Sequence, residues 1–241
     1  NNLLTSILGN ASLARLDLPP RSPAERSLDR IEQTALRAAE LCQQMLAYAG
    51  KGRLVVQPHD LTQLVQDTTQ LLQVSISKKA ALNFAFAPGL PAVMADASQL
   101  RQIVMNLVIN ASEAIGDQPG TIALATGLVR ADHSYLADTR PACNLPEGDY
   151  VFLEVSDTGC GMTPELRARI FEPFFTTKFT GRGLGLAAVM GIVRGHGGAL
   201  KLRSEPGLGS TFRLLLPAVP GVVVSEPSLP VEWGWYDTYG G

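Results

Sequence analysis

Aromatic and charged residues are both scarce, at 6% and 17% of the 241 residues. The chain also lacks a positive excess, since its formal charge is −2 at pH 7, which gives no overall reason to expect nucleic acid or an anionic membrane surface as a partner. No apolar run approaches the roughly 20 residues that span a bilayer. Cys42, Cys143 and Cys160 are odd in number and form no Cys-x-x-Cys pair, which predicts neither a disulfide framework nor a zinc site. These absences favour a cytoplasmic protein whose partners must be inferred from local sites.

Hydrophobic residues, at 46%, suffice for two domains. In the first, residues 1–51, apolar and small residues recur every three to four positions on two segments: Leu4, Ile7, Ala11, Ala14 and Leu18, then Leu28, Ile31, Ala35, Ala38, Cys42, Met45 and Ala49. Pro19-Pro20-Arg21 breaks the first helix, Ser22-Pro23-Ala24-Glu25 begins the second with a capping serine, and Gly50-Lys51-Gly52 ends it. The pattern predicts a helical hairpin whose exposed seam pairs with a second copy in a homodimeric four-helix bundle, or else packs on the rest of its own chain. The chain starts inside this helical pattern, so we expect it to be cut from a longer protein.

Residues 52–217 mix helical and strand patterns. We expect helices at 60–74, 96–115 and 184–194, the first two capped by Asp60 and Asp96, and strands at 82–87, 93–95, 121–129, 150–156, 199–204 and 211–216. Helices interleaved with mostly antiparallel strands predict an α+β sandwich with one helical layer on one sheet. Residues 218–241 are interpreted as a linker or C-terminal tail, although Trp233, Trp235, Tyr236 and Tyr239 make it more aromatic than a tether requires.

Three local patterns carry candidate chemistry. Asn106, Asn110 and Glu113 share one helix face, where an amide oxygen can hold a hard cation, although such a face can also simply be solvated. The turn Asp157-Thr158-Gly159-Cys160-Gly161 offers a carboxylate to an exocyclic amine such as that of adenine, or is an ordinary Asp-Thr-Gly turn. Gly181-Arg182-Gly183-Leu184-Gly185-Leu186 opens a helix whose N–H groups suit phosphates. It does not follow a strand, which disfavours a dinucleotide-binding fold.

The order and spacing of these patterns resemble one family. Blocks at 106–111, 157–161, 171–175 and 181–185 resemble the N, G1, F and G2 boxes of the histidine-kinase ATP-binding domain, and 207–212 resembles its closing glycine motif. The resemblance implies a Bergerat-type sandwich at 52–217, cofactors ATP and Mg²⁺, and a mobile ATP lid at 162–182. It also implies that the F block, Phe171, Phe174 and Phe175, anchors the lid and contacts the dimerisation helices, a role compatible with simple core packing.

The resemblance also assigns roles to individual residues. Asn110 would ligate Mg²⁺, Asp157 would read adenine with Gly159 and Gly161 beside it, and Thr211 would support the adenine pocket. Gly181, Gly183 and Gly185, with Leu184 and Leu186, would line the triphosphate. Asn106, Glu113 and Thr177 complete the expected ATP site, and Lys178 and Arg182 stand where either can meet the γ-phosphate.

Position 106 favours a kinase for histidine over a rapid ATPase. Related ATPases such as gyrase carry a glutamate general base at this catalytic position, whereas the amide of Asn106 accepts no proton, and a neutral imidazole needs little activation. Asn1-Asn2-Leu3-Leu4 resembles the end of the family's His-Asp-Phe-Asn-Asn-Leu-Leu motif, which places the phosphate-accepting histidine three residues before Asn1 and gives Asn2 a role in dephosphorylating a response regulator. The histidines present are poor substitutes: His59 in a linker-like stretch, His133 in a long loop, and His196 at a helix end where it caps. A gyrase-like ATPase and a non-catalytic nucleotide-binding dimerisation module remain the alternatives.

Overall fold

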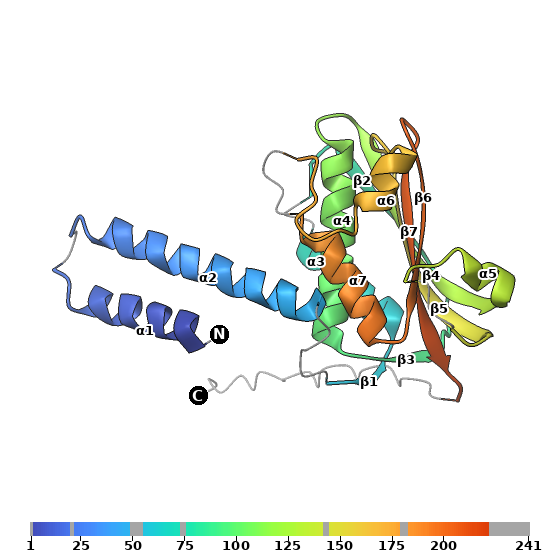
Figure 1. Ribbon diagram of the computed structural model, residues 1–241, viewed down its shortest axis with the longest axis horizontal. Coiled ribbons are helices and arrows are strands. Elements are labelled where there is room, and N and C mark those ends of the chain that lie inside the picture. Colours follow the sequence, from blue (N-terminus) through green and yellow to red (C-terminus); the bar gives the residue numbers. More distant parts are fainter. Residues whose placement is uncertain are drawn as a thin grey trace, which may run out of the picture.

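A pair of helices and a larger α/β body make up the chain (Figure 1). The computed structural model describes residues 2–19, 22–48, 55–72, 76–141, 145–178 and 183–221. The expected helix end at 50–52, the loop residues Gly181 and Arg182, and the tail from residue 222 lie outside these ranges. Within them, no helix combines the length and the apolar character needed to cross a bilayer.

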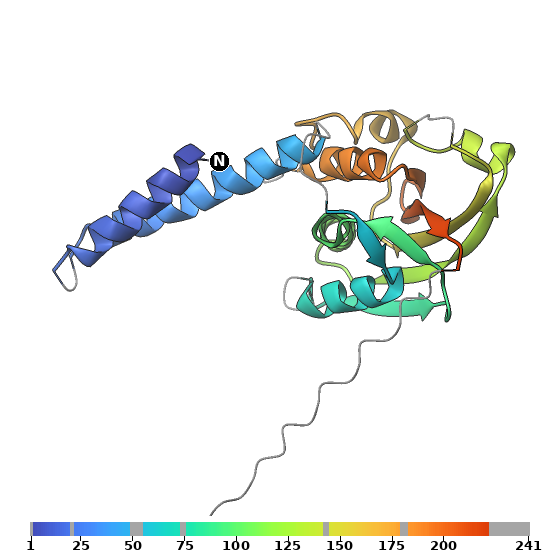
Figure 2. The ribbon, with the colours of Figure 1, turned by 90° about the horizontal axis from the view of Figure 1, so that it is seen from below.

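The first two helices lie side by side, α1 at Asn2–Leu16 and α2 at Glu25–Tyr48 (Figures 1 and 2). Helix α2 begins at Glu25, and just before it Ser22 Oγ accepts a hydrogen bond from the N–H of Ala24 at 3.3 Å, the contact expected of a capping serine. Helix α2 also contacts α7 (Gly185–Gly195) of the body. The chain thus forms an antiparallel helix pair whose second helix reaches the α/β body.

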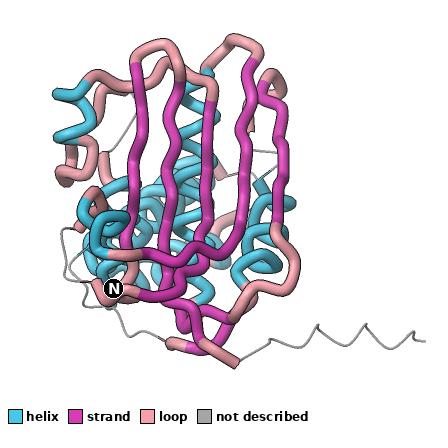
Figure 3. The backbone as a smooth tube through the Cα atoms, turned by 90° about the vertical axis from the view of Figure 1, so that its right-hand side faces the viewer, coloured by secondary structure: helices cyan, strands magenta, loops and turns pink. Residues whose placement is uncertain are grey.

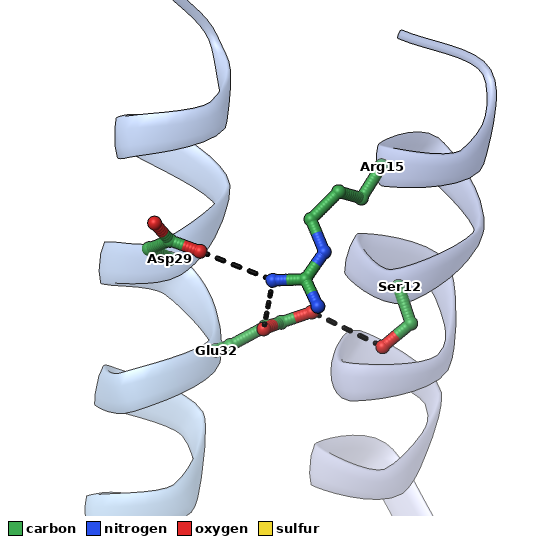
Figure 4. Close-up of polar contacts among 4 residues, drawn as sticks. All are labelled: Ser12, Arg15, Asp29 and Glu32. Atoms are coloured by element: carbon green, nitrogen blue, oxygen red, sulfur yellow. Dashed lines mark hydrogen bonds and ion pairs between the residues drawn. The ribbon is translucent and has the colours of Figure 1, made fainter. Parts of the chain in front are cut away.

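Polar contacts join the two helices near their connecting turn (Figure 4). Arg15 Nη1 of α1 lies 3.1 Å from Asp29 Oδ1 and 3.4 Å from Glu32 Oε2 of α2. Ser12 Oγ donates to Glu32 Oε1 at 3.1 Å. About half of the Arg15 side chain is exposed, so this cluster orients the helices more than it stabilises them.

The body is a mixed β-sheet with its main helical layer on one face, while the short helix α5 (His133–Ala137) packs on the other. Its elements in chain order are β1 (Gln57–His59), α3 (Leu61–Leu72), β2 (Ala80–Phe86), β3 (Ala92–Ala95), α4 (Ala97–Ile115), β4 (Gly120–Ala131), α5, β5 (Gly148–Asp157), α6 (Pro164–Arg169), α7, β6 (Ala199–Glu205) and β7 (Gly209–Val219). The strand order is β1-β3-β7-β5-β4-β2, β6 also pairs with β7, and only β2 and β4 run parallel among the described strand pairs. Helices α3, α4 and α7 cover one face, and Figure 3 shows the opposite face with its strands toward the viewer. The predicted α+β fold is confirmed.

Carboxylate caps determine where the two central helices begin. Asp60 Oδ1 accepts from the N–H groups of Thr62 at 2.8 Å and Gln63 at 3.1 Å, at the start of α3. Asp96 Oδ1 likewise accepts from Ser98 at 2.9 Å and Gln99 at 3.2 Å, at the start of α4. Such a cap contributes about 0.5–2 kcal/mol because it satisfies N–H groups that have no partner inside the helix. Both predicted caps are confirmed.

Side chains that alternate between the two faces of the sheet place every second strand residue in the hydrophobic core. On β5, Val151, Leu153 and Val155 point to the helical layer and are buried, as are Ile122 and Leu124 on β4. They pack in one cluster with buried α4 residues: Leu100, Ile103, Val104, Leu107, Val108 and Ala111. Because side chains alternate along a strand, the last residue of β5, Asp157, also points inward. A carboxylate therefore lies at the edge of an apolar core.

Two of the three histidines lie in elements that the sequence did not indicate. His59 is the last residue of β1 and His133 the first residue of α5, which corrects the expected linker-like stretch and long loop. His196 ends α7 as expected: its Nδ1 lies 2.8 Å from the carbonyl oxygen of Ile192, while its Nε2 accepts from the N–H of Asp96 at 3.0 Å. The imidazole thus links the end of α7 to the start of α4.

Candidate functional site

A cavity of about 540 Å³ opens between α4, the end of β5, α6 and the start of α7. Eleven of the residues expected at a nucleotide site line it: Asn106, Asn110, Glu113, Asp157, Gly161, Thr177, Lys178, Gly183, Leu184, Gly185 and Leu186. Its other lining residues, which were not among those expected to contact the nucleotide, are mostly apolar: Ile109, Ala114, Cys160, Met162, Leu166, Ile170, Phe175, Thr176, Ser210 and Phe212. A largely apolar cavity with a few convergent polar groups is the usual form of a small-molecule site.

Asp157 provides the buried acceptor of this cavity. Its side chain accepts hydrogen bonds from the backbone N–H of Gly159, at 2.8 Å, and from that of Ser210. Burial raises the pKa of Asp157, and these two N–H groups and the nearby charge of Lys178 lower it in part. Since the residue is 6% exposed and lines the cavity, its carboxylate can accept from an amine on a flat apolar ligand. Gly159 itself does not line the cavity but helps to orient this carboxylate.

The turn after Asp157 lies against the hairpin of β6 and β7. Gly161 has a φ of 63°, and a Cβ at this position would overlap the backbone carbonyl of Glu205. The N–H of Gly207 donates to the carbonyl oxygen of Cys160 at 2.8 Å, which ties the hairpin turn to the same loop. Only glycine fits this left-handed, crowded position. The close approach therefore determines the shape of one cavity wall.

The polar face of α4 forms another wall. Asn106 Nδ2 is buried and has no hydrogen-bond partner among the described residues, although such a group costs about 1–3 kcal/mol when it stays unsatisfied. Its Oδ1 lies close to Gly185, where an added Cβ would be only 3.3 Å away. One turn later Asn110 Oδ1 lies 3.4 Å from Lys178 Nζ, which also forms an ion pair with Glu113. This face thus combines an unsatisfied donor with two oxygen acceptors that already hold a cation.

Helix α7 points its N-terminus into the cavity. Gly183, Leu184, Gly185 and Leu186 line this end, and no side chain in the described part of the chain caps it. Free N–H groups and the positive end of the helix dipole favour an anionic ligand such as phosphate. Gly181 and Arg182, expected in the same place, lie outside the described residues.

The expected lid, residues 162–182, is partly an ordered helix. Thr163 Oγ1 accepts from the N–H of Leu166 at 3.3 Å and Pro164 occupies the first turn, so that α6 forms within the lid. Of the three phenylalanines in the F block, Phe171 and Phe175 pack against the core, whereas Phe174 is 60% exposed with a φ of 66°. The contact of this block with the dimerisation helices stays a prediction.

Thr211 does not lie in the cavity, contrary to expectation. Along β7, Ser210 and Phe212 face the helical layer and the cavity, so Thr211 between them points to the opposite face of the sheet. There its Oγ1 lies 2.8 Å from Ser156 Oγ, and it lines a separate polar depression with Glu154 and Arg213. Ser210 takes the position expected of Thr211. Asn2 begins α1, and its side chain is outside the described set.

Comparisons with known proteins point to one family. The family described as histidine kinase-, DNA gyrase B- and HSP90-like ATPase matches residues 95–220. The chain is 37% identical over 219 residues to the sensor kinase CckA of Brucella abortus (strain 2308), and this match covers 90% of this chain and 23% of that protein. It is 33% identical to the sensory histidine kinase/phosphatase NtrB of Rhizobium meliloti (strain 1021), in a match that covers 93% of this chain and 57% of that protein. It is 35% identical to the sensor histidine kinase ZraS of Escherichia coli (strain K12), in a match that covers 90% of this chain and 43% of that protein. The chain thus spans between about a quarter and somewhat over half of these relatives.

The similar solved structures are also histidine kinases. Full-length ShkA in complex with AMPPNP superposes with a TM-score of 0.68 at 26% identity, covering 90% of this chain and 43% of that one. The nucleotide-free catalytic domain of the histidine kinase ThkA gives a TM-score of 0.54 at 27% identity, covering 68% and 95%. The chain therefore belongs to the family of histidine kinase-, DNA gyrase B- and HSP90-like ATPases, and is homologous to the catalytic part of sensor histidine kinases.

Proposed function

We propose that this chain is the nucleotide-binding catalytic core of a sensor histidine kinase and binds Mg²⁺-ATP in the cavity between α4 and α7. The observation that carries the proposal is the distribution of polar groups in that cavity. Asp157 is a buried acceptor, and its turn packs against Ala114 of α4. The uncapped start of α7 packs instead against the unsatisfied amide of Asn106, two turns earlier on the same helix. This order matches a nucleotide, with adenine on Asp157 and the phosphates at α7.

The residues present fit Mg²⁺ as well as ATP. Asn110 Oδ1 is a neutral oxygen donor of the kind that Mg²⁺ accepts, and it lies on the same helix face as Asn106 and Glu113. We assign Asn110 as the metal ligand. The bound metal would neutralise charge on the phosphates and help to position them. Lys178 and Thr177 line the same part of the cavity and would contact the phosphates.

The proposed reaction is transfer of the γ-phosphoryl group to a histidine nitrogen, with ADP leaving, followed by relay to an aspartate of a response regulator. The amide of Asn106 cannot act as a general base, so it orients the phosphates and does not activate water. The accepting histidine would precede Asn1 by three residues, and Asn2, one helical turn after it, would serve the phosphatase reaction. A cytoplasmic setting and a receiver domain as partner follow from the same proposal.

We also propose that α1 and α2 form a homodimeric four-helix bundle. An open depression between them is lined by Leu4, Ile7, Ile31, Ala35 and Ala38, and Ile7 and Ile31 are 45% and 44% exposed. A second helix pair would cover these side chains. Sedimentation equilibrium should give twice the chain mass, and a monomeric mass for Ile31→Asp would support this interface.

Two measurements test the proposed function. Calorimetric titration of the chain with AMPPNP and Mg²⁺ should show binding that Asn110→Ala weakens at least tenfold while Glu147→Gln, an exposed charge control beside α5, leaves it unchanged. A chain extended upstream through the expected histidine should then gain acid-labile, alkali-stable label from γ-labelled ATP. Steady phosphate release without label would favour the ATPase, and firm binding with neither would favour the non-catalytic module.

A further inference from the structure

A lysine ammonium lies between the oxygen atoms of the proposed metal site. Lys178 Nζ is 3.4 Å from Asn110 Oδ1 and forms an ion pair with Glu113, although both partners are more than 60 positions away in sequence. Its backbone is held locally, because the N–H of Lys178 donates to Thr176 Oγ1 at 3.1 Å. This arrangement brings a positive charge from the loop after Phe175 onto the polar face of α4.

An ammonium group and a divalent cation both bind to oxygen atoms such as those of Asn110 and Glu113. Lys carries donors only, so it interacts with the same amide and carboxylate oxygens that Mg²⁺ or Mn²⁺ would coordinate. The two cations cannot share these oxygens, because two unit charges 4 Å apart already repel by about 4 kcal/mol at an effective dielectric constant of 20. A metal ion at Asn110 therefore requires Lys178 to leave.

We propose that Lys178 acts as an internal cation, occupying the Asn110–Glu113 oxygen pair until Mg²⁺-nucleotide arrives, and that Glu113 is the positioning residue that holds it there. The inference deepens the proposed function and rests on it. A bound metal ion would take the place of the ammonium, and Lys178 would then pair with the phosphates of the nucleotide. Glu113 thus couples occupation of the site to the position of residues 176–178.

Hydrogen exchange of the nucleotide-free chain tests the positioning role. Glu113→Gln breaks the ion pair and should raise amide exchange at residues 174–178 by about two- to fivefold, the range expected when a partly exposed ion pair is lost. Glu147→Gln removes the same charge far from the cavity, from a side chain that is 53% exposed against 49% for Glu113, and should leave these amides unchanged. Equal exchange in the two variants would overturn the inference.

Metal binding without nucleotide tests the internal cation. Lys178→Met uncovers the oxygen pair, so electron paramagnetic resonance with Mn²⁺ alone should show affinity at least about tenfold above that of the unsubstituted chain. Adding Glu113→Gln to Lys178→Met should remove most of this gain. A Lys178→Met chain that melts normally but binds Mn²⁺ no more tightly than the parent would contradict the idea.

These experiments separate the inference from the proposed function, because neither uses nucleotide. A chain that fails to bind AMPPNP refutes the proposed function whatever the exchange and Mn²⁺ results are. A chain that binds AMPPNP normally, but in which Glu113→Gln behaves as Glu147→Gln does, retains the proposed function and loses the internal cation.

Discussion

Replacing Gly161 with alanine tests the close approach between the Asp157–Gly161 turn and the β6–β7 hairpin. A left-handed backbone costs a non-glycine residue about 1–2 kcal/mol, and the new Cβ would overlap the carbonyl of Glu205, an atom of the backbone that cannot rotate away. Overpacking of this kind adds about 1–3 kcal/mol. We therefore expect Gly161→Ala to lower the free energy of unfolding by about 2–5 kcal/mol.

Urea denaturation followed by circular dichroism measures this loss, and two other glycines separate its two causes. Gly207 has a φ of 77° and nothing within 4 Å of an added Cβ, so Gly207→Ala should show the backbone cost alone, about 1–2 kcal/mol. Gly148 has neither feature, and its alanine variant should stay within about 0.5 kcal/mol of the parent. A Gly161→Ala midpoint equal to that of Gly207→Ala would refute the close approach.

Three further substitutions probe other parts of the chain. Because burial raises the pKa of Asp157, the folded chain binds this proton more tightly than the unfolded chain, and stability falls as pH rises from the ordinary value of 3.8 through the raised one. Asp157→Asn should remove that loss, seen as a higher urea midpoint at neutral pH, while weakening AMPPNP binding about tenfold or more; a lower midpoint would contradict this. Arg15→Ala should cost no more than about 1 kcal/mol, and less in high salt, by thermal melts at two ionic strengths. His196→Ala leaves the N–H of Asp96 without its acceptor and should cost about 1–3 kcal/mol by urea denaturation, whereas an unchanged midpoint would show that water replaces the ring.

Local signals in the sequence were sufficient to place most elements and their starts. Asp96 predicted the start of α4 because a carboxylate immediately before a helical pattern satisfies free N–H groups of the first turn, and the structure shows those hydrogen bonds. Thr163-Pro164 carries the same kind of signal for α6, a capping hydroxyl followed by a proline in the first turn. The three-residue β1 has too little pattern of its own, because its strand character comes from pairing with β3.

The sequence could not determine which side of the sheet some side chains face, or which residues distant in sequence come into contact. Ser210 and Thr211 are adjacent hydroxyl residues, and only the register of β7 against β5 decides which one faces the cavity. The cluster of Asn110, Glu113 and Lys178 joins segments more than 60 positions apart in the sequence, and no local rule predicts that an ammonium lies against those oxygens. The order of the motifs therefore predicted most of the polar and glycine residues that line the cavity, whereas their geometry depends on tertiary packing.

The hydrogen bond from the N–H of Phe174 to the carbonyl oxygen of Gly183, at 2.9 Å, closes the chain between these residues into a loop with a fixed base. For a loop closed in this way, doubling the number of residues costs only about 0.6 kcal/mol in closure entropy. The cavity floor, built by α4 and β5, does not depend on that length. A reporter peptide inserted between Lys178 and Gly183, outside the cavity-lining residues 175–178, should accordingly report nucleotide binding by fluorescence without rebuilding the domain.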